Sequence, residues 1–534
     1  MDVAGSPAPQ RWLPMGIQDA LWLEMDRPAN AMVADVAVWT AEPVDFDLLQ
    51  AAITERFVER YPVFRSRAVR NALGEWGWEP DPDFDIANHF SIATLTDPAD
   101  PRCMHALVAA HRTELLCRDR PLWRVIWVER YRGGSAMILR SHHAVADGMR
   151  MVQLAMSLFD ASPQGGAILG PAVAQHGAQP DPAGPKSRRL RNAVTEFTAV
   201  VHTAGRWLAE MPGRRAAATR RPALHTARLG RVAFRNPLGA LHSLVHGLRR
   251  AVSAAVAALR RALPGGGTLA GIAAAAPGNL GTVRKFVLGT FNDVTIWTGP
   301  ASGCKGVAWS PPLSLPAVKS VAKAHGCTVN DVLVATVASA LHDYLRSRDA
   351  HCASVAFMVP VNLKPLDLSL PETLGNEFAL VQLELPTDEP DPVAVLEIAR
   401  RRMNRIKNGN EAAVAFRLQE AIAKFSPAMY EASVELFTNR TLGVLTNVPG
   451  PPIPVYLAGA LVEGIAGWAP VSGDQPMSFS ICSYNGDVVV GIACDTELVP
   501  GYEGIVDGFA VAFDRLVART PGVDATAGGR QLSP

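Results

Sequence analysis

The chain has 534 residues and a mass of 57.0 kDa, more than one ordinary hydrophobic core accommodates, so two domains of α/β size with connecting material are expected. Hydrophobic residues make up 48% of the sequence and charged residues 19%, a balance typical of globular proteins. The formal net charge of +1 excludes a whole-chain electrostatic attraction to nucleic acid, so no nucleic-acid partner is expected.

The cysteines and the N-terminus indicate the compartment. No CxxC motif or Cys/His cluster occurs, which predicts reduced thiols and no metal site. The segment MDVAGSPAPQRW lacks a basic stretch followed by an apolar one, so no secretory signal is predicted. No apolar run reaches the roughly 18 residues of a membrane span. We therefore expect a cytoplasmic protein that contacts membranes only peripherally. The seven cysteines are Cys103, Cys117, Cys304, Cys327, Cys352, Cys482 and Cys494.

Residues 11 to about 160 alternate between helix-like and strand-like patterns, which predicts a mixed α/β domain. Residues 124–130 and 135–141 are predicted to be strands joined by a turn at Gly133-Gly134. The second strand leads directly into a pair of histidines. Residues 149–159 then have the apolar spacing of a half-buried helix.

A long connection follows this first part of the chain. Residues 161–185 are rich in Gly, Pro, Gln and Ala, which predicts a linker. Residues 186–261 contain sixteen Lys and Arg against two acidic residues, a net charge of about +14. Apolar residues at steps of three and four between Leu238 and Leu263, with arginine pairs between them, predict a basic amphipathic helix. Such a helix suits an anionic membrane or lipid-droplet surface; alternatively it packs on the protein with solvated arginines, or the segment is partly disordered.

A second α/β part begins near residue 286. We therefore expect three parts: an N-terminal half at 1–185, a basic helical crossover at 186–285 and a C-terminal half at 286–534. Its first helix is predicted over residues 316–325. The next, over 329–345, is apolar on nearly every face and is therefore predicted to be buried, with Thr328 and Asp331 in a capping-box relation at its start. Strands are predicted at residues 354–361, 379–385, 477–482 and 487–493.

The strongest chemical signal is the segment Ser141-His142-His143-Ala144-Val145-Ala146-Asp147-Gly148, placed between a strand end and a helix start. Histidine suits a general base because its ordinary pKa of about 6.5 allows proton exchange near neutral pH. Asp147 would order the loop through a buried ion pair, and Gly148 would permit a tight turn or close packing. A structural histidine pair or half of a metal site is the alternative interpretation.

This motif carries a resemblance. HHAVADG matches the HHxxxDG signature of the coenzyme A-dependent acyltransferase superfamily, which includes chloramphenicol acetyltransferase and peptide-synthetase condensation domains. More narrowly, the chain resembles the bacterial wax ester synthase/acyl-CoA:diacylglycerol acyltransferases, because further segments match that family in order. These are Gln18-Asp19-Ala20-Leu21-Trp22, Pro121-Leu122-Trp123, Thr328-Val329-Asn330-Asp331-Val332-Leu333, Pro360-Val361-Asn362-Leu363-Lys364-Pro365, Leu374-Gly375-Asn376, Thr446-Asn447-Val448-Pro449-Gly450-Pro451 and Ser483-Tyr484-Asn485-Gly486.

The resemblance implies an α/β fold of two chloramphenicol-acetyltransferase-like halves with mixed sheets and a central channel. It implies His143 as the general base, with His142 and Asp147 in support and Gly148 completing the motif. Positions expected to bind or adjoin substrate are Pro121, Leu122, Trp123, Asn330, Asp331 and Asn376. For these, a packing corner, a helix cap and a buried turn amide remain open as structural alternatives.

The implied reaction is acyl transfer from acyl-CoA to diacylglycerol, with long-chain alcohols as second acceptors. No metal or bound cofactor is expected, since coenzyme A enters as part of a substrate, and no GxSxG nucleophile motif occurs. Lys364 stands where the family often has arginine, and the basic insert is unusually long; both leave the acceptor open. Alternatives are an acyltransferase of secondary metabolism acting on a polyketide-like alcohol and a non-catalytic lipid-surface protein. The sequence gives no indication of the oligomeric state.

Overall fold

The fold is that of a computed structural model, which describes residues 12–166, 295–362, 374–376, 378–408 and 441–523. These residues belong to one compact unit of the chain. The predicted linker after residue 166, the basic amphipathic helix, the whole crossover at 186–285 and Lys364 lie outside the described residues. No helix among the described residues is both long and apolar enough to cross a bilayer.

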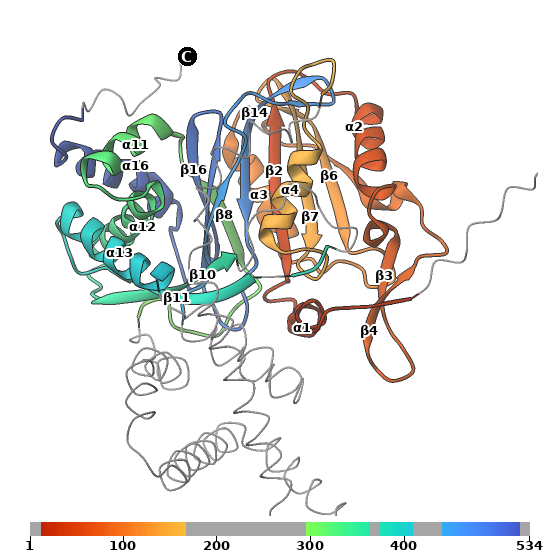
Figure 1. Cartoon of the computed structure of the whole chain (residues 1–534), viewed down its shortest axis with the longest axis horizontal. Helices are drawn as coiled ribbons and strands as arrows, with labels where there is room; N and C mark the ends of the chain where they lie inside the picture. The colour runs from red at the N-terminus through yellow and green to blue at the C-terminus, as the bar shows by residue number, and fades with distance from the viewer. Residues whose placement is uncertain (1–11, 167–294, 363–373, 377, 409–440, 524–534) are drawn as a thin grey trace, which may run out of the picture. The chain divides into compact units, whose positions relative to one another are not determined.

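A six-stranded mixed sheet forms the core of the first half (Figure 1). Its order is β13-β14-β2-β7-β6-β5, with β5 parallel to β6 and the other neighbours antiparallel. Two of its strands, β13 and β14, come from the predicted third part of the chain, so the last third completes the sheet of the first. The strands are β2 (Val33–Thr40), β5 (Phe90–Ala93), β6 (Trp123–Tyr131), β7 (Gly134–His142), β13 (Tyr456–Leu457) and β14 (Ala460–Trp468).

The hairpin between β6 and β7 confirms the two predicted strands but not the predicted turn. Arg132 and Gly133 both have positive φ, as a two-residue type I′ turn requires, so the turn lies one residue earlier than expected. Gly134 is already in β7. A Cβ there would lie 1.9 Å from the carbonyl oxygen of Thr40, so close approach to β2 is what requires glycine at this position.

Helices and a small sheet surround this first sheet. Helix α4 starts directly after the histidine motif and confirms the helix predicted there. The helices are α1 (Ile17–Met25), α2 (Phe46–Ile53), α3 (Pro101–His111) and α4 (Gly148–Ser157), and a three-stranded sheet contains β1 (Leu13–Pro14), β4 (Trp76–Pro80) and β3 (Ser66–Arg70).

The second half has a five-stranded sheet with helices α11, α12, α13 and α16 gathered on the side away from β2 and β14 (Figure 1). Helix α12 begins with the predicted Thr328–Asp331 capping box, and most of its side chains are buried, as its apolar faces predicted. The helices are α11 (Leu315–Ala324), α12 (Val329–Arg346), α13 (Pro392–Asn408) and α16 (Glu503–Ala518). The sheet contains β12 (Leu445–Pro449), β15 (Met477–Tyr484), β16 (Asp487–Asp495), β8 (Lys305–Trp309) and β9 (Leu313–Ser314), and β10 (Ser354–Asn362) pairs with β11 (Phe378–Pro386).

The two halves share a buried aromatic core. Trp309 of β8 stacks on Trp39 of β2 with ring centroids 5.7 Å apart and lies 5.6 Å from Trp468 of β14. These rings belong to a hydrophobic cluster that contains residues of both halves. Burying large aromatic surfaces is among the strongest contributions that packing makes to stability, so this cluster fixes one half against the other.

Candidate active site

The histidine motif lies where β7 ends and α4 begins, and a segment of the second half holds it. Residues 374–376 run beside the motif: Gly375 N–H donates to the carbonyl of Val145 (3.1 Å), and Asp147 N–H donates to the carbonyl of Gly375 (3.1 Å). Gly375 has a φ of +84°, and a Cβ there would lie 3.1 Å from Oδ2 of Asp19, so this position requires glycine. Hydrogen bonds to a segment of the second half therefore hold the motif in place.

His142 is fully buried behind the site. Its Nδ1 accepts a hydrogen bond from Ala144 N–H (3.1 Å), so the ring proton belongs on Nε2, which faces Oδ2 of Asp26 at 3.5 Å. Burial alone would raise the pKa of Asp26, but the hydrogen bond and charge of His142, with the N–H of Met32 and the charge of Arg118, hold it below its ordinary value. His142 thus supports the site as part of a buried network.

Pro121, Leu122 and Trp123 lie in the core and do not line the cavity described below. The carbonyl of Leu122 accepts from His142 N–H (3.0 Å). Trp123 stacks on His89 with ring centroids 4.3 Å apart and donates its Nε1–H to the carbonyl of Phe64 (2.9 Å). These three residues therefore have the placement of a packing corner, which was the alternative to substrate binding.

His143 lies at the wall of the cavity. Its backbone N–H donates to the carbonyl of Met32 (2.8 Å), and Trp22 of α1 stacks on its ring at 4.3 Å. Burial lowers the pKa of His143 to about 4, opposed mainly by the charge of Asp147. The imidazole is therefore neutral at neutral pH and free to accept a proton. Its Nδ1 is buried without a hydrogen-bond partner, so Nε2 is the nitrogen available to the cavity.

Asn376 does not line the cavity but binds the backbone of His143. Its Nδ2 donates both to the carbonyl of His143 (2.9 Å) and to Oδ1 of Asp19 (2.7 Å). Burial raises the pKa of Asp19 to about 6, although the Asn376 side chain, two backbone N–H groups and the charge of Arg150 oppose the rise. This geometry is that of a buried turn amide, which was the structural alternative for Asn376.

Asp147 caps helix α4, since its carboxylate accepts a hydrogen bond from Arg150 N–H (2.9 Å). The expectation for Gly148 was wrong. Its φ is not positive, and a Cβ added there would meet no atom within 4 Å, so neither a tight turn nor close packing requires glycine. Gly148 lines the cavity, and its missing side chain leaves room there.

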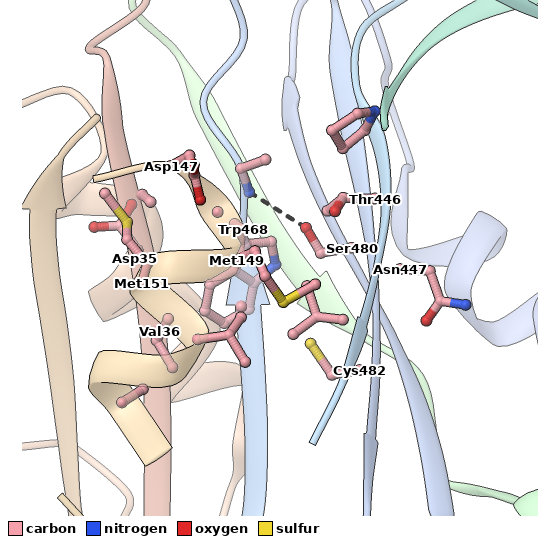
Figure 2. A pocket seen from close by; sticks show the side chains of 18 of the residues that line it. Asp35, Val36, Asp147, Met149, Met151, Thr446, Asn447, Trp468, Ser480 and Cys482 are labelled. Carbon is pink, nitrogen blue, oxygen red and sulfur yellow. Dashed lines mark hydrogen bonds between the residues drawn. The ribbon is translucent and has the colours of Figure 1, made fainter. Parts of the chain in front are cut away.

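A cavity of about 230 Å³ lies between the halves, at the expected central channel. Helix α4 forms one side, and the strands carrying Thr446, Ser480 and Cys482 form the other, with Met149 projecting between them (Figure 2). Most of its lining is apolar. The side of α4 contributes Gly148, Met149, Met151, Val152, Ala155, Met156 and then Phe159. Strands β2 and β14 of the first sheet contribute Val36, Ile465, Gly467 and Trp468, and the opposite strands β12 and β15 contribute Thr446, Asn447, Ser480 and Cys482.

Several polar side chains of the cavity, among them Asp147, Thr446 and Ser480, lie toward the histidine end (Figure 2). Strand β2 pairs Val33 with His142, and Asp35 with Trp468. Ser480 Oγ accepts from the N–H of the next residue, Ala469 (3.3 Å; Figure 2), so Ser480 lies toward that end. Thr446 is the register partner of Ser480 in the neighbouring strand. The rest of the lining is mostly apolar and forms a trough that follows α4 away from His143.

Asn330 and Asp331 lie at the start of α12, outside the cavity lining. Asp331 accepts from Thr328 N–H and Oγ1–H, which is the helix cap foreseen as an alternative. Asn330 Oδ1 accepts from Nδ2 of Asn447 (3.0 Å), and Asn447 does line the cavity. Asn330 therefore contacts the site through one intermediate side chain.

All seven cysteines are free thiols. Within the described ranges, no three His, Cys, Asp or Glu side chains are grouped so that they could hold a metal ion. His142 is instead engaged by Asp26 and the backbone of Ala144.

Sequence reasoning missed three residues of the site: Asp19, Trp22 and Asp26. Asp19 and Trp22 lie within Gln18–Trp22, one of the segments that resemble the family. The cavity residues Thr446 and Asn447 lie within another such segment. The resemblance therefore could have indicated all four residues. Asp26 had none, because only the folded chain brings it to His142.

The chain is similar in sequence to known proteins. The model of the wax ester synthase/diacylglycerol acyltransferase catalytic domain matches residues 15–333, and that of the WS/DGAT C-terminal domain matches residues 374–517. The chain is 24% identical over 508 residues to the Mycobacterium tuberculosis protein named probable diacylglycerol O-acyltransferase tgs1, covering 93% of each. It is 25% identical over 463 residues to tgs2 of the same species, named likewise, covering 84% of this chain and 86% of the relative.

Two solved structures share the fold. The wax ester synthase/diacylglycerol acyltransferase from Marinobacter aquaeolei VT8 aligns with a TM-score of 0.60 at 20% identity, over 95% of this chain and 99% of that one. The first condensation domain of the calcium-dependent antibiotic synthetase aligns with a TM-score of 0.51 at 15% identity, over 98% and 99%. The expected fold class, α/β with mixed sheets in two halves, is confirmed.

The matching catalytic-domain model and the relatives named diacylglycerol O-acyltransferase show that the chain is an acyltransferase. With both family models matching most of its length, the chain belongs to the wax ester synthase/diacylglycerol acyltransferase family.

Proposed function

We propose that this chain transfers a long acyl group from acyl-CoA to the free hydroxyl of diacylglycerol, and to long-chain alcohols as second acceptors, with His143 as general base. The observation that carries the proposal is the position of His143 at the polar end of an apolar trough. The names of the mycobacterial relatives favour diacylglycerol as the first acceptor.

The length of the trough suits a fatty chain. From Gly148 to Phe159 the wall follows α4 and its C-terminal turn for twelve residues, and the eleven steps between them, at about 1.5 Å each, give a length of about 16 Å. An extended alkyl chain with C–C bonds of about 1.5 Å advances about 1.3 Å per carbon, so about twelve carbons fit along this wall. Long-chain substrates are therefore favoured over acetyl groups.

In the proposed reaction, Nε2 of His143 removes the hydroxyl proton as the acceptor oxygen attacks the thioester carbonyl. The tetrahedral intermediate expels the coenzyme A thiolate, which takes the proton back from Nε2 as it leaves. The products are an ester and free coenzyme A, and no acyl-enzyme forms. General base catalysis contributes about 10² to 10⁴-fold, and the remainder comes from positioning and from donors to the oxyanion.

Thr446 and Ser480 are the proposed oxyanion donors. Both hydroxyls line the polar end of the cavity from adjacent strands. Because Ser480 Oγ already accepts from Ala469 N–H, its own hydrogen is the part of the group left to donate. No further cofactor has a role in this mechanism.

We place the enzyme in the cytoplasm, at the inner face of the membrane or on lipid droplets, where a lipid acceptor is found. The support is the basic sequence between residues 186 and 261. Replacing Arg249, Arg250, Arg260 and Arg261 by Gln should weaken binding to anionic vesicles most at low salt, because each basic residue contributes about 1 kcal/mol at such a surface. Equal binding of wild type and variant at low salt would exclude this segment as the anchor.

The deciding experiment incubates purified protein with radiolabelled palmitoyl-CoA and either diacylglycerol or a long-chain alcohol, and separates the esters by thin-layer chromatography. Wild type should form ester, and His143→Ala should be at least about 10²-fold slower while remaining folded. His142→Ala should lose less. Near-normal turnover by folded His143→Ala would refute the mechanism.

Two further results would favour the alternatives. Preference for carrier-linked thioesters and polyketide-like alcohols would indicate secondary metabolism. Absence of ester with every acceptor would indicate a non-catalytic lipid-surface protein.

A further inference from the structure

Ala469, the residue that follows β14, is held at the wall of the cavity by three hydrogen bonds. Its N–H donates to Oγ of Ser480 (3.3 Å; the dashed line in Figure 2). Its carbonyl accepts from Oγ–H of Ser478 (3.0 Å) and from Nη2–H of Arg112 (3.1 Å). Ala469 and Ser480 line the cavity, whereas Arg112 does not. Arg112 therefore reaches a residue of the wall from behind it.

An ion pair fixes the Arg112 side chain. Arg112 directly follows α3 and is buried. Its Nη1–H donates to Oδ2 of Asp35 on β2 (2.6 Å), and Nε–H of Arg140 on β7 donates to Oδ1 of the same carboxylate (2.9 Å). A guanidinium is planar and presents its N–H groups in a rigid fork. The ion pair on Nη1 therefore determines where Nη2 points, which is to the carbonyl of Ala469.

Ala469 needs such support because strand pairing does not reach it. The last ladder pair between β14 and β2 is Trp468 with Asp35. A serine hydroxyl has one hydrogen to donate and rotates to suit its neighbours. The N–H of Ala469 directs the Ser480 hydroxyl only while the backbone of Ala469 stays in place, and a donor to an oxyanion has to be oriented before the reaction.

We infer that Arg112 is a positioning residue for the oxyanion site. By holding the carbonyl of Ala469, Arg112 keeps the N–H of that residue on Oγ of Ser480, which leaves the Ser480 hydrogen for the oxyanion. Arg112 does not contact the substrate and takes no part in proton transfer. The inference rests on the proposed function, in which Ser480 is an oxyanion donor.

Arg140 offers a matched control. It is also buried, shares the Asp35 carboxylate, and donates from Nη2 to a backbone carbonyl, that of Glu114 (3.1 Å). Glu114 does not line the cavity. Lysine at either position keeps a positive charge beside Asp35 but has no planar fork to hold the carbonyl as well. Arg112→Lys and Arg140→Lys thus alter the ion pair alike and differ in which carbonyl loses its donor.

The test measures kcat, KM and thermal unfolding for Arg112→Lys, Arg140→Lys, Ser480→Ala and the double variant Arg112→Lys/Ser480→Ala, with palmitoyl-CoA and diacylglycerol. We expect kcat to fall about 10-fold in both Arg112→Lys and Ser480→Ala, less than the loss of about 10² to 10³-fold that follows removal of a principal oxyanion donor, because Thr446 remains. Arg140→Lys should lose similar stability but keep kcat within about twofold, and KM should stay within about twofold in all variants. The double variant should have the kcat of Ser480→Ala to within about twofold, because Arg112 acts only through that hydroxyl.

Ser478→Ala tests the same inference without disturbing the ion pair, and replaces Arg112→Lys if that variant does not fold. It removes the other donor to the Ala469 carbonyl, so kcat should fall about threefold, and only where Ser480 is present. An unchanged kcat in Ser478→Ala would then overturn the inference.

The outcomes separate this inference from the proposed function. Equal losses of kcat in Arg112→Lys and Arg140→Lys, or losses that multiply in the double variant, overturn the role of Arg112 and leave His143 as the base. If Ser480→Ala keeps full kcat, Ser480 is not an oxyanion donor and the inference fails with that assignment. Retained turnover in His143→Ala would instead defeat the proposed function itself.

Discussion

Replacing Asp19 by Asn is expected to alter how stability depends on pH. Asp19 is a buried carboxyl group whose pKa is raised from 3.8 to about 6, with burial as the largest cause. Below pH 3.8 it is protonated in both the folded and the unfolded chain. Between about pH 4 and 6 the folded chain holds a proton that the unfolded chain releases, so the free energy of unfolding falls as pH rises through this window.

The magnitude follows from the shift. About two pKa units at 1.36 kcal/mol each give a penalty of about 3 kcal/mol, fully present above pH 6. About 2 kcal/mol of it should develop between pH 4.5 and 7.5. Asn at position 19 does not titrate, so the variant escapes this pH-dependent loss. Any constant cost of the substitution, such as a poorer contact with a backbone N–H, cancels when the two pH values are compared.

Urea unfolding of both proteins at pH 4.5 and 7.5 measures the effect. The stability of Asp19→Asn relative to wild type should rise by about 2 kcal/mol from the lower to the higher pH. A stability difference that is the same at both pH values would refute the raised pKa and the argument built on it.

Three other changes test separate parts of the site. Asp147→Ala should lower the free energy of unfolding by about 1 kcal/mol or more, because the N-cap of α4 is lost. Asp147→Asn should lower it less, because Asn also caps helices. Equal losses of unfolding free energy in urea would contradict a capping role. Gly148→Ala should melt at the same temperature as wild type but lower kcat/KM for palmitoyl-CoA about 10-fold. Phe159→Ala should shift the preferred acyl chain length upward, because each added buried carbon contributes about 0.8 kcal/mol. If neither variant changes the preference among acyl-CoA substrates, these residues do not form part of the wall that binds the acyl chain. Thr446→Val combined with Ser480→Ala should reduce kcat about 10²-fold with little change in KM, and an unchanged kcat would exclude them as oxyanion donors.

Local patterns predicted much of this fold. The apolar faces and the capping box of α12 lie within one stretch of sequence, and the structure reproduces that helix to within one residue. The strands β10, β11, β15 and β16 likewise match their predicted positions to within two residues. Alternation and capping are short-range properties, so a single sequence is enough to recognise them.

Roles that depend on distant contacts were harder to predict. Asn376 was expected to bind or adjoin substrate, yet it donates to the backbone of His143 and lies outside the cavity lining. The sequence contains no information about which acceptors surround an amide in the folded state. Gly148 was interpreted through backbone conformation, although what matters there is the empty space beside it. The pairing of β14 with β2 joins residues more than 400 positions apart, which no periodicity can indicate.

That pairing limits how substrates can enter. Six residue pairs connect β14 to β2, and the residue that follows β14, Ala469, is hydrogen-bonded to Ser480 in the other sheet. A motion that pulled β14 away from β2 would have to break this ladder, which is too costly to occur at every turnover. The part of the cavity wall that these two strands form is therefore expected to stay intact while a bulky lipid enters. The flexible methionines Met149 and Met156 on α4 are suited to yield to chains of different shape.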